Sequence, residues 1–208
     1  MNKKQIVKTY KSYSPFYDKL FGAIFEKGRY DAIKLLNLKG NEKVLEVGVG
    51  SGLSLKRYPE STKIVGIDLS GEMLKKAEEK VLLNKLKGID LKLEDAEEMV
   101  FGKDSFDKVI IMYTLSVTPN PDKLLEKAHK VCKNNGDILI LNHFNHKKSI
   151  FYFLYGRILR YIERKLGFRM YFPIKKYLSY IKELGAKDIK VISTNFGFSK
   201  IIHLKKQV

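Results

Sequence analysis

The sequence predicts an α/β protein built on a doubly wound sheet that is mostly parallel and carries an antiparallel C-terminal edge strand. Two observations carry this prediction: short apolar, β-branched runs recur between residues 43 and 142, and helical patterns separate most of them. Helical crossovers between short buried strands imply parallel pairing. N-terminal cover helices and a basic amphipathic insertion are expected outside this core.

The core strands are predicted in chain order. Residues 43–47 form the first strand, glycines end it at positions 48, 50 and 52, and a helix is expected to begin within residues 53–58. The other core strands are predicted at residues 63–68, 90–93, 106–112 and 137–142. Near the end of the chain, two short apolar runs flank Asn195-Phe196-Gly197, which predicts a hairpin that adds an antiparallel edge.

The longer helices are bounded by residues that typically start or stop helices. Ser70 is the residue type of an N-cap and predicts a helix over about residues 71–84. Pro119 and Pro121 mark the entry to a second helix at about residues 122–132, and Gly136 follows its end.

The 208 residues are expected to form a single domain, because 44% of them are hydrophobic and supply an ample core. This composition excludes a disordered tail or a fibre. The predicted parts are a helical cover, a ligand-binding core, a basic amphipathic lid or membrane segment and a hairpin, at residues 1–40, 41–143, 144–185 and 186–208.

The charge of the chain is concentrated at its two ends. The formal net charge is +17, of which residues 1–43 carry +6 and residues 144–208 carry +12, whereas residues 44–143 carry −1. This distribution indicates a middle that holds a small ligand between ends that face an anionic surface or substrate. A generally lysine-rich proteome is the alternative explanation.

The sequence predicts a cytoplasmic protein that associates peripherally with the inner face of the cell membrane. Its longest apolar run, residues 150–155, is far shorter than the roughly 18 to 20 residues of a membrane-spanning helix. The lysine-rich start has no apolar stretch typical of a secretory signal. The single cysteine, Cys132, forms no internal disulfide or cysteine-based zinc site, as expected in a reducing compartment.

The glycine turn and an acidic residue predict a nucleoside ligand at the carboxyl ends of a Rossmann-like sheet. Gly48, Gly50 and Gly52 let the backbone approach a ligand closely. Asp68 ends the second strand 20 residues after the first glycine, a usual distance for a carboxylate that accepts from ribose hydroxyls. A dinucleotide fingerprint would need a third glycine where this chain has Leu53, which argues against NAD. A plain tight turn is the alternative.

Three motifs resemble those of class I S-adenosylmethionine (SAM)-dependent methyltransferases. They are Glu46-Val47-Gly48-Val49-Gly50-Ser51-Gly52, Val65-Gly66-Ile67-Asp68 and Glu94-Asp95-Ala96-Glu97. The resemblance implies that SAM is the cofactor and S-adenosylhomocysteine (SAH) the product. It also implies that the glycine loop, with Glu46, contacts the methionine end, Asp68 the ribose, Asp95 and the Ala96 amide the adenine edge, and Met73 the adenine face. A solvated acid is the alternative role of Asp95.

A narrower resemblance lies outside these motifs. Tyr10-Lys11-Ser12-Tyr13-Ser14-Pro15-Phe16-Tyr17-Asp18, the stretch from Phe21 to Arg29 and Leu141-Asn142-His143-Phe144 resemble the soluble bacterial phosphatidylethanolamine N-methyltransferases. It implies methylation of phosphatidylethanolamine and its methylated derivatives at the membrane surface. The first motif is shared with quinone-ring methyltransferases, so a quinone or another small-molecule acceptor is the alternative. An RNA methyltransferase is less favoured, because no RNA-binding module is visible and nucleic acid is not expected as a partner.

Aromatic residues and a histidine are the predicted acceptor site. Methylated ammonium groups favour aromatic faces, which makes Tyr17 and Tyr113 predicted catalytic residues and Tyr10 and Tyr13 predicted substrate contacts. His143 ends the fifth strand and is expected to face the same crevice, where it would receive the amine proton or hold a phosphate oxygen. The alternatives are core-packing tyrosines and a histidine bonded to backbone. Neither a metal nor a covalent nucleophile is required.

The segment from Lys147 to Lys176 is predicted to be a basic amphipathic helix. Apolar residues recur at helical spacing, with basic residues between them. Such a helix can lie in the interface of an anionic phospholipid membrane, and Arg160 and Arg164 are predicted substrate contacts. A lid helix that packs on the domain is the alternative. A nonenzymatic nucleoside-binding module is the remaining class, and failure to bind SAM would distinguish it.

Overall fold

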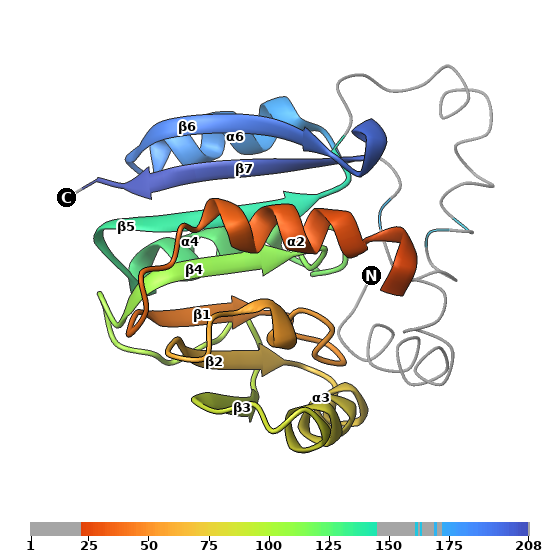
Figure 1. Ribbon diagram of the computed structural model, residues 1–208. Helices are drawn as coiled ribbons and strands as arrows, with labels where there is room; N and C mark the ends of the chain where they lie inside the picture. Colours follow the sequence, from red (N-terminus) through yellow and green to blue (C-terminus); the bar gives the residue numbers. More distant parts are fainter. Residues whose placement is uncertain (1–21, 145–160, 162, 164–168, 170–171, 208) are drawn as a thin grey trace.

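The computed structural model describes residues 22–144, 161, 163, 169 and 172–207, and these residues form one seven-stranded sheet (Figure 1). The strand order is β3-β2-β1-β4-β5-β7-β6. The strands are β1 (Lys43–Val47), β2 (Lys63–Asp68), β3 (Ile89–Leu93), β4 (Phe106–Met112), β5 (Cys132–Asn142), β6 (Ala186–Thr194) and β7 (Ser199–Lys206).

The sheet is parallel from β3 to β5 and becomes antiparallel at the C-terminal hairpin. β1 pairs in parallel with β2 and β4, while β7 pairs antiparallel with both β5 and β6. The chain moves outward from β1 to β3 and returns to β4, so the strand order reverses between β1 and β4. The predicted doubly wound sheet with an antiparallel C-terminal edge is confirmed.

The central strands form because both of their faces are buried, whereas the edge strands β3 and β6 are largely exposed. In β4, Val109 and Ile111 belong to one apolar cluster and Ile110 and Met112 to the other, and all four are buried. Alternating side chains of a strand point to opposite faces, so a continuous apolar run supplies both clusters. This is why apolar and polar residues do not alternate at positions 109–112, although these residues form a strand.

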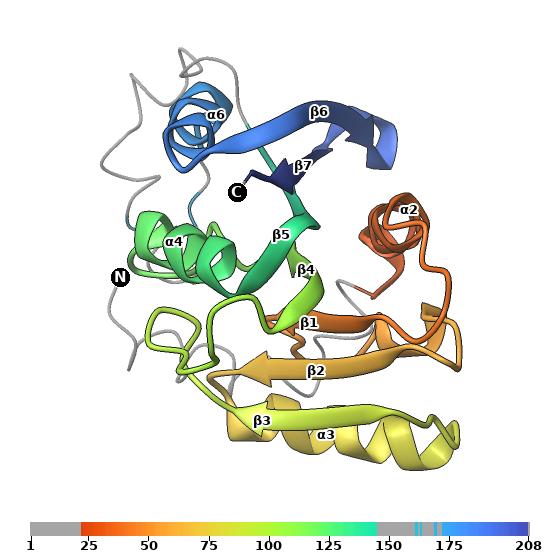
Figure 2. The same cartoon turned by 90° about the vertical axis from the view of Figure 1, so that its left-hand side faces the viewer.

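Helices cover both faces (Figure 2). On one face, α2 (Glu26–Leu35) and α3 (Gly71–Leu83) contribute to the same apolar cluster; on the other, α4 (Pro121–Val131) and α6 (Ile174–Glu183) contribute to the second. Two side chains cap these helices as their types suggest: Ser70 accepts from the Met73 amide, and Asn120 accepts from the Lys123 amide.

The structure differs from the sequence prediction in two places. The helix expected within residues 53–58 is only a 3-10 turn, η1 (Leu55–Arg57), because Pro59 follows and the preceding Tyr58 is extended. β5 begins at Cys132 rather than at residue 137, and Gly136 lies where the β4–β5 register shifts. A side chain at Gly136 would collide with the carbonyl of Asp107, so close approach explains this glycine.

Two negative findings hold for the part of the chain that the structure describes. Within it, no helix is long and apolar enough to cross a bilayer. Nor do its His, Cys, Asp and Glu side chains form any group of three suited to a metal ion. The predicted amphipathic helix at residues 147–176 lies mostly outside the described residues.

Candidate functional site

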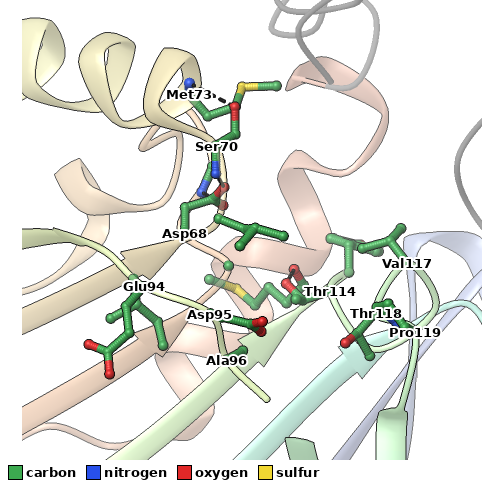
Figure 3. A pocket seen from close by; sticks show the side chains of 16 residues that line it. Asp68, Ser70, Met73, Glu94, Asp95, Ala96, Thr114, Val117, Thr118 and Pro119 are labelled. Atoms are coloured by element: carbon green, nitrogen blue, oxygen red, sulfur yellow. Dashed lines mark hydrogen bonds between the residues drawn. The ribbon is translucent and has the colours of Figure 1, made fainter. Parts of the chain in front are cut away.

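A cleft lies at the carboxyl ends of the strands, where the strand order reverses. Its floor is the glycine loop after β1, and its walls come from the ends of β2, β3 and β4 (Figure 3). The space between its walls, with the solvent in its open mouth included, is about 780 Å³. Open α/β sheets bind ligands at such a switch point.

The glycine loop brings bare backbone to this cleft. Gly48 and Gly50 have φ angles of 73° and 56°, in the left-handed region that favours glycine, and both line the cleft. A Cβ at Gly48 would lie 2.0 Å from Thr114 Oγ1, whereas nothing lies within 4 Å of the Cβ position at Gly50. Gly52 packs on Ala77 of α3 and does not line the cleft. The loop therefore leaves ligand space above Gly50.

Asp68 ties the glycine loop to the end of β2. One carboxylate oxygen accepts from the Gly50 amide at 2.9 Å and the other accepts from the Ser70 amide at 2.9 Å. Burial raises the pKa of this carboxyl above its usual value, while the two amides oppose that shift. Each oxygen keeps a further lone pair, so Asp68 can also accept hydrogen bonds from a ligand in the cleft.

The wall at the end of β3 is formed by Glu94, Asp95 and Ala96. Figure 3 shows the Asp95 carboxylate directed toward Thr114 and the Glu94 carboxylate directed away. Asp95 Oδ1 also accepts from the Glu97 amide at 2.9 Å. Ala96 and the buried Met73 add apolar surface to this wall. Asp68, Asp95 and this apolar surface suit a ligand that combines hydroxyl and amine donors with a flat base.

A second cavity continues the cleft past the glycine loop, because Gly48, Gly50, Met112 and Tyr113 line both. Its charged members are Glu46 and Arg29, both buried.

Glu46 itself does not line the main cleft, because its carboxylate turns to two hydroxyls. It accepts from Ser54 Oγ at 2.5 Å and from Tyr58 OH at 2.8 Å. Burial raises the pKa of Glu46 to about 7, against the opposing effects of both hydroxyls and the Arg29 charge.

Tyr113 stands between the two cavities. It follows β4 with a φ of 58°, which turns its backbone sharply at the end of the strand. Its ring packs 4.4 Å from the ring of Phe25, measured between centroids, and its hydroxyl accepts from Asn195 Nδ2 at 2.7 Å. Burial raises the pKa of the phenol above 10, so it stays neutral at physiological pH.

His143 follows β5 but is not part of the cleft lining. Its Nε2 lies 2.5 Å from the carbonyl oxygen of Arg169, so this ring nitrogen engages backbone. The Arg169 guanidinium donates to the carbonyls of Thr118 and Pro119, two residues that do line the cleft. Desolvation lowers the pKa of His143 below its usual value. The geometry therefore connects His143 to the cleft wall through Arg169.

The other predicted acceptor residues lie outside the described residues. They are Tyr10, Tyr13, Tyr17, Arg160 and Arg164.

Several polar residues at the site are not identified from the sequence, among them Thr114, Thr118, Arg29 and Asn195. Arg29 reaches the second cavity from α2, and the only signal was its place in the stretch that resembles lipid N-methyltransferases. Asn195 was interpreted only as a turn residue, because its contact with Tyr113 spans 82 positions and leaves no local pattern.

Comparisons with known proteins agree with this fold and cleft. A family model described as "Methyltransferase domain" matches residues 45–140. The chain is 36% identical over 172 residues to the phosphatidylethanolamine N-methyltransferase of Cereibacter sphaeroides, covering 82% of this chain and 83% of that protein. It is 28% identical over 216 residues to the ubiquinone/menaquinone biosynthesis C-methyltransferase of Geotalea daltonii, covering 96% and 90%.

A solved structure has a similar fold. The phosphoethanolamine N-methyltransferase 2 of Haemonchus contortus, in complex with phosphomonomethylethanolamine and SAH, superposes with a TM-score of 0.72 at 18% identity. The match covers 87% of this chain and 52% of that one.

The strand order and the position of the cleft define an α/β protein with a candidate small-ligand site, and the comparisons identify its class as the methyltransferases. The chain belongs to the class I SAM-dependent methyltransferases. The predicted family and cofactor are confirmed. The protein is therefore an enzyme that transfers a methyl group from SAM and releases SAH.

Proposed function

We propose that this enzyme methylates the amine of phosphatidylethanolamine and of its mono- and dimethyl derivatives, at the inner face of the cell membrane. The observation that carries the proposal is the 36% identity with a phosphatidylethanolamine N-methyltransferase over 82% of the chain. The basic C-terminal part, with a net charge of +12 over residues 144–208, supports an anionic surface as partner.

The cleft supplies suitable partners for each part of the cofactor. Asp68 would accept from the ribose hydroxyls, and Asp95 with the Ala96 amide would hold the adenine edge against Met73. The glycine loop and Arg29 would hold the methionine end, because Gly50 has no side chain to keep a ligand from the loop and Arg29 is a buried cation lining the second cavity. When bound, SAM supplies an electrophilic methyl group on a sulfonium sulfur.

The acceptor amine would meet aromatic and neutral groups. Tyr113 lines both cavities and remains an uncharged phenol, so it offers an aromatic face to an ammonium group. Cation–π attraction contributes about 0.5 to 2 kcal/mol at such a face. His143 would act by holding the Arg169 segment against the cleft wall. In this proposal Tyr10, Tyr13 and Tyr17 complete the cover, and Arg160 and Arg164 bind the lipid.

Two exposed phenylalanines support action at a membrane. Phe196 and Phe198 are 95% and 80% exposed and flank Gly197 at the tip of the β6–β7 hairpin. This tip lies at the edge of the sheet where the cleft opens, because Lys200 of β7 pairs with Asn142 at the end of β5 (Figure 1). Adjacent exposed aromatic side chains at a loop tip suit insertion into the interface of a bilayer.

The test is to supply methyl-labelled SAM with vesicles of phosphatidylethanolamine and an anionic lipid, and to identify the labelled product by chromatography. The proposal expects label in the mono-, di- or trimethylated lipid, with turnover that falls as salt weakens vesicle binding. Label absent from every lipid product would overturn it.

Methylation of a reduced quinone ring is the second candidate. The match to a ubiquinone/menaquinone C-methyltransferase over 96% of this chain favours it. Reduced demethylmenaquinone supplied in the same assay separates the two candidates, because this function requires label in the quinone and none in the lipid amine.

A further inference from the structure

Asn195 joins three elements that the sequence keeps far apart. It is 4% exposed and lies in the turn between β6 and β7 with a φ of 48°. Asparagine tolerates this left-handed conformation better than most residues. Its Oδ1 accepts from the Gly28 amide at 2.8 Å, and its Nδ2 donates to the Tyr113 hydroxyl at 2.7 Å. One amide thus links the hairpin, α2 and the end of β4.

The bond to Gly28 has a local structural role. Gly28 lies in the first turn of α2, where backbone amides have no partner within the helix. Asn195 therefore satisfies one of these amides, as an N-cap side chain would. An aspartate at position 195 could make the same bond, because it needs only a carboxylate oxygen.

In the bond to Tyr113 the amide nitrogen is the donor, whereas an aspartate there could only accept a hydrogen bond from the phenol. Nδ2 donates to the phenol oxygen and to Ser199 Oγ at 3.2 Å, so the phenol oxygen acts as acceptor in this contact. A Cβ at Gly28 would lie 2.5 Å from that oxygen and 2.7 Å from Nδ2. The phenol is thus confined between the helix, the asparagine and Phe25.

We propose that Asn195 is a positioning residue of the methyl-acceptor site, which clamps the Tyr113 phenol against the start of α2 so that its ring faces the junction of the two cavities. The inference rests on the proposed role of Tyr113 at the acceptor. It gives the C-terminal hairpin a part in the reaction, although the hairpin lies outside the cofactor-binding strands.

The test separates the clamp from the helix cap with Asn195→Gly, which removes both hydrogen bonds without straining the left-handed backbone, and with Tyr113→Phe, which removes only the phenol hydroxyl. Thr194→Val is the matched control: it breaks the neighbouring contact of Thr194 Oγ1 with Asp31 of α2 at 2.5 Å and leaves Tyr113 untouched. Tyr113→Phe and the double variant complete a cycle. Turnover is measured with phosphatidylethanolamine vesicles and with reduced demethylmenaquinone, and SAH binding by calorimetry.

Asn195→Gly is expected to lower kcat about 10- to 100-fold for whichever acceptor the wild type methylates, because catalysis depends steeply on positioning. The Kd for SAH should change less than about twofold, and the Thr194→Val enzyme should keep near-wild-type kcat. Asn195→Gly should add no loss to Tyr113→Phe, whereas a role as helix cap alone would lower kcat in both backgrounds. Wild-type kcat in Asn195→Gly, equal losses in Thr194→Val, or independent losses in the double variant would each overturn the clamp.

A spectroscopic readout keeps the clamp distinct from the identity of the acceptor. In protein labelled with 13C at the tyrosine ζ carbon, Tyr113→Phe assigns the Tyr113 signal. Asn195→Gly should shift that signal and Thr194→Val should leave it unchanged. An unshifted signal would overturn the clamp, whereas failure of wild-type enzyme to methylate phosphatidylethanolamine would overturn only the proposed substrate.

Discussion

The cleft wall formed by the glycine loop, β2 and β3 differs from the wall around Tyr113 in how its residues are brought together. In the first wall, Asp68 bonds to Gly50, 18 residues away, and to Ser70, two residues away. In the second, Asn195 bonds to Gly28 across 167 residues and to Tyr113 across 82. The wall proposed to bind the cofactor is built from successive strand–loop units, and the wall proposed to bind the acceptor is built by tertiary packing.

This difference suggests how one fold serves several acceptors. The strand–loop units can keep the same cofactor contacts while α2 and the hairpin, which come from the two ends of the described chain, change around Tyr113. Substitutions on the two walls should therefore affect different kinetic constants.

Asp68→Ala should abolish useful cofactor binding. The alanine removes a carboxylate proposed to accept two ribose hydroxyls, and hydrogen bonds to charged groups contribute about 1.5 to 3 kcal/mol each. The KM for SAM should rise by roughly a hundredfold or more in turnover assays. Asp90→Ala, at a largely exposed side chain on β3, is the control. A KM for SAM within about threefold of wild type would show that the two walls are not divided as proposed.

Glu46→Gln should change how stability depends on pH. The folded-state pKa of Glu46 is raised from its ordinary value of 4.5 to about 7 by burial. The folded protein therefore holds a proton that the unfolded chain has lost, and stability falls as pH rises from 4.5 to 7, by about 3 kcal/mol at most.

Melting temperatures of apo wild type and Glu46→Gln between pH 5 and 8 test this. Wild type should lose stability across the range, and the variant should lose less. Parallel curves for the two proteins would show that Glu46 is not the group responsible.

Gly28→Ala should damage the acceptor side although alanine favours helices by about 1 kcal/mol over glycine. The added methyl group would lie 2.5 Å from the Tyr113 hydroxyl oxygen, so the phenol must move. We expect kcat to fall about tenfold or more while the Kd for SAH stays within about twofold. Gly71→Ala is a matched control that should keep kcat. Gly71 is the first residue of α3, and no atom lies within 4 Å of its Cβ position. Equal losses in the two variants would remove the close-approach explanation.

Phe196→Ser combined with Phe198→Ser should weaken vesicle binding about tenfold, because two exposed aromatic side chains would lose their apolar environment in the interface. Leu82→Ser with Leu83→Ser, two exposed residues at the end of α3, is the control. Sedimentation with anionic vesicles measures the binding. Similar losses in both double variants would mean that the hairpin tip has no special part in membrane contact.

The strands were predictable because burial on both faces leaves continuous apolar runs, and the predicted bounds of β1, β2 and β4 match the structure. Gly48, Gly50 and Asp68 were predictable as cleft residues because they follow or end such runs, whereas Asp95 follows the largely exposed β3 and was predictable only from its motif. The 3-10 turn η1 after the glycine loop was not predictable as such. The apolar pattern of residues 53–58 suggests a longer helix, but Pro59 holds Tyr58 in an extended conformation and ends it. The turn of His143 toward Arg169 depends on a contact 26 residues away that no periodicity encodes.

The central claim is that the cleft at the reversal of strand order binds the methyl donor. Calorimetric titration of SAH into the wild-type protein tests it most directly. The account predicts saturable binding of one SAH per chain, with a rise in melting temperature as SAH is added. A titration without binding heat, together with an unchanged melting temperature at saturating SAH, would contradict it.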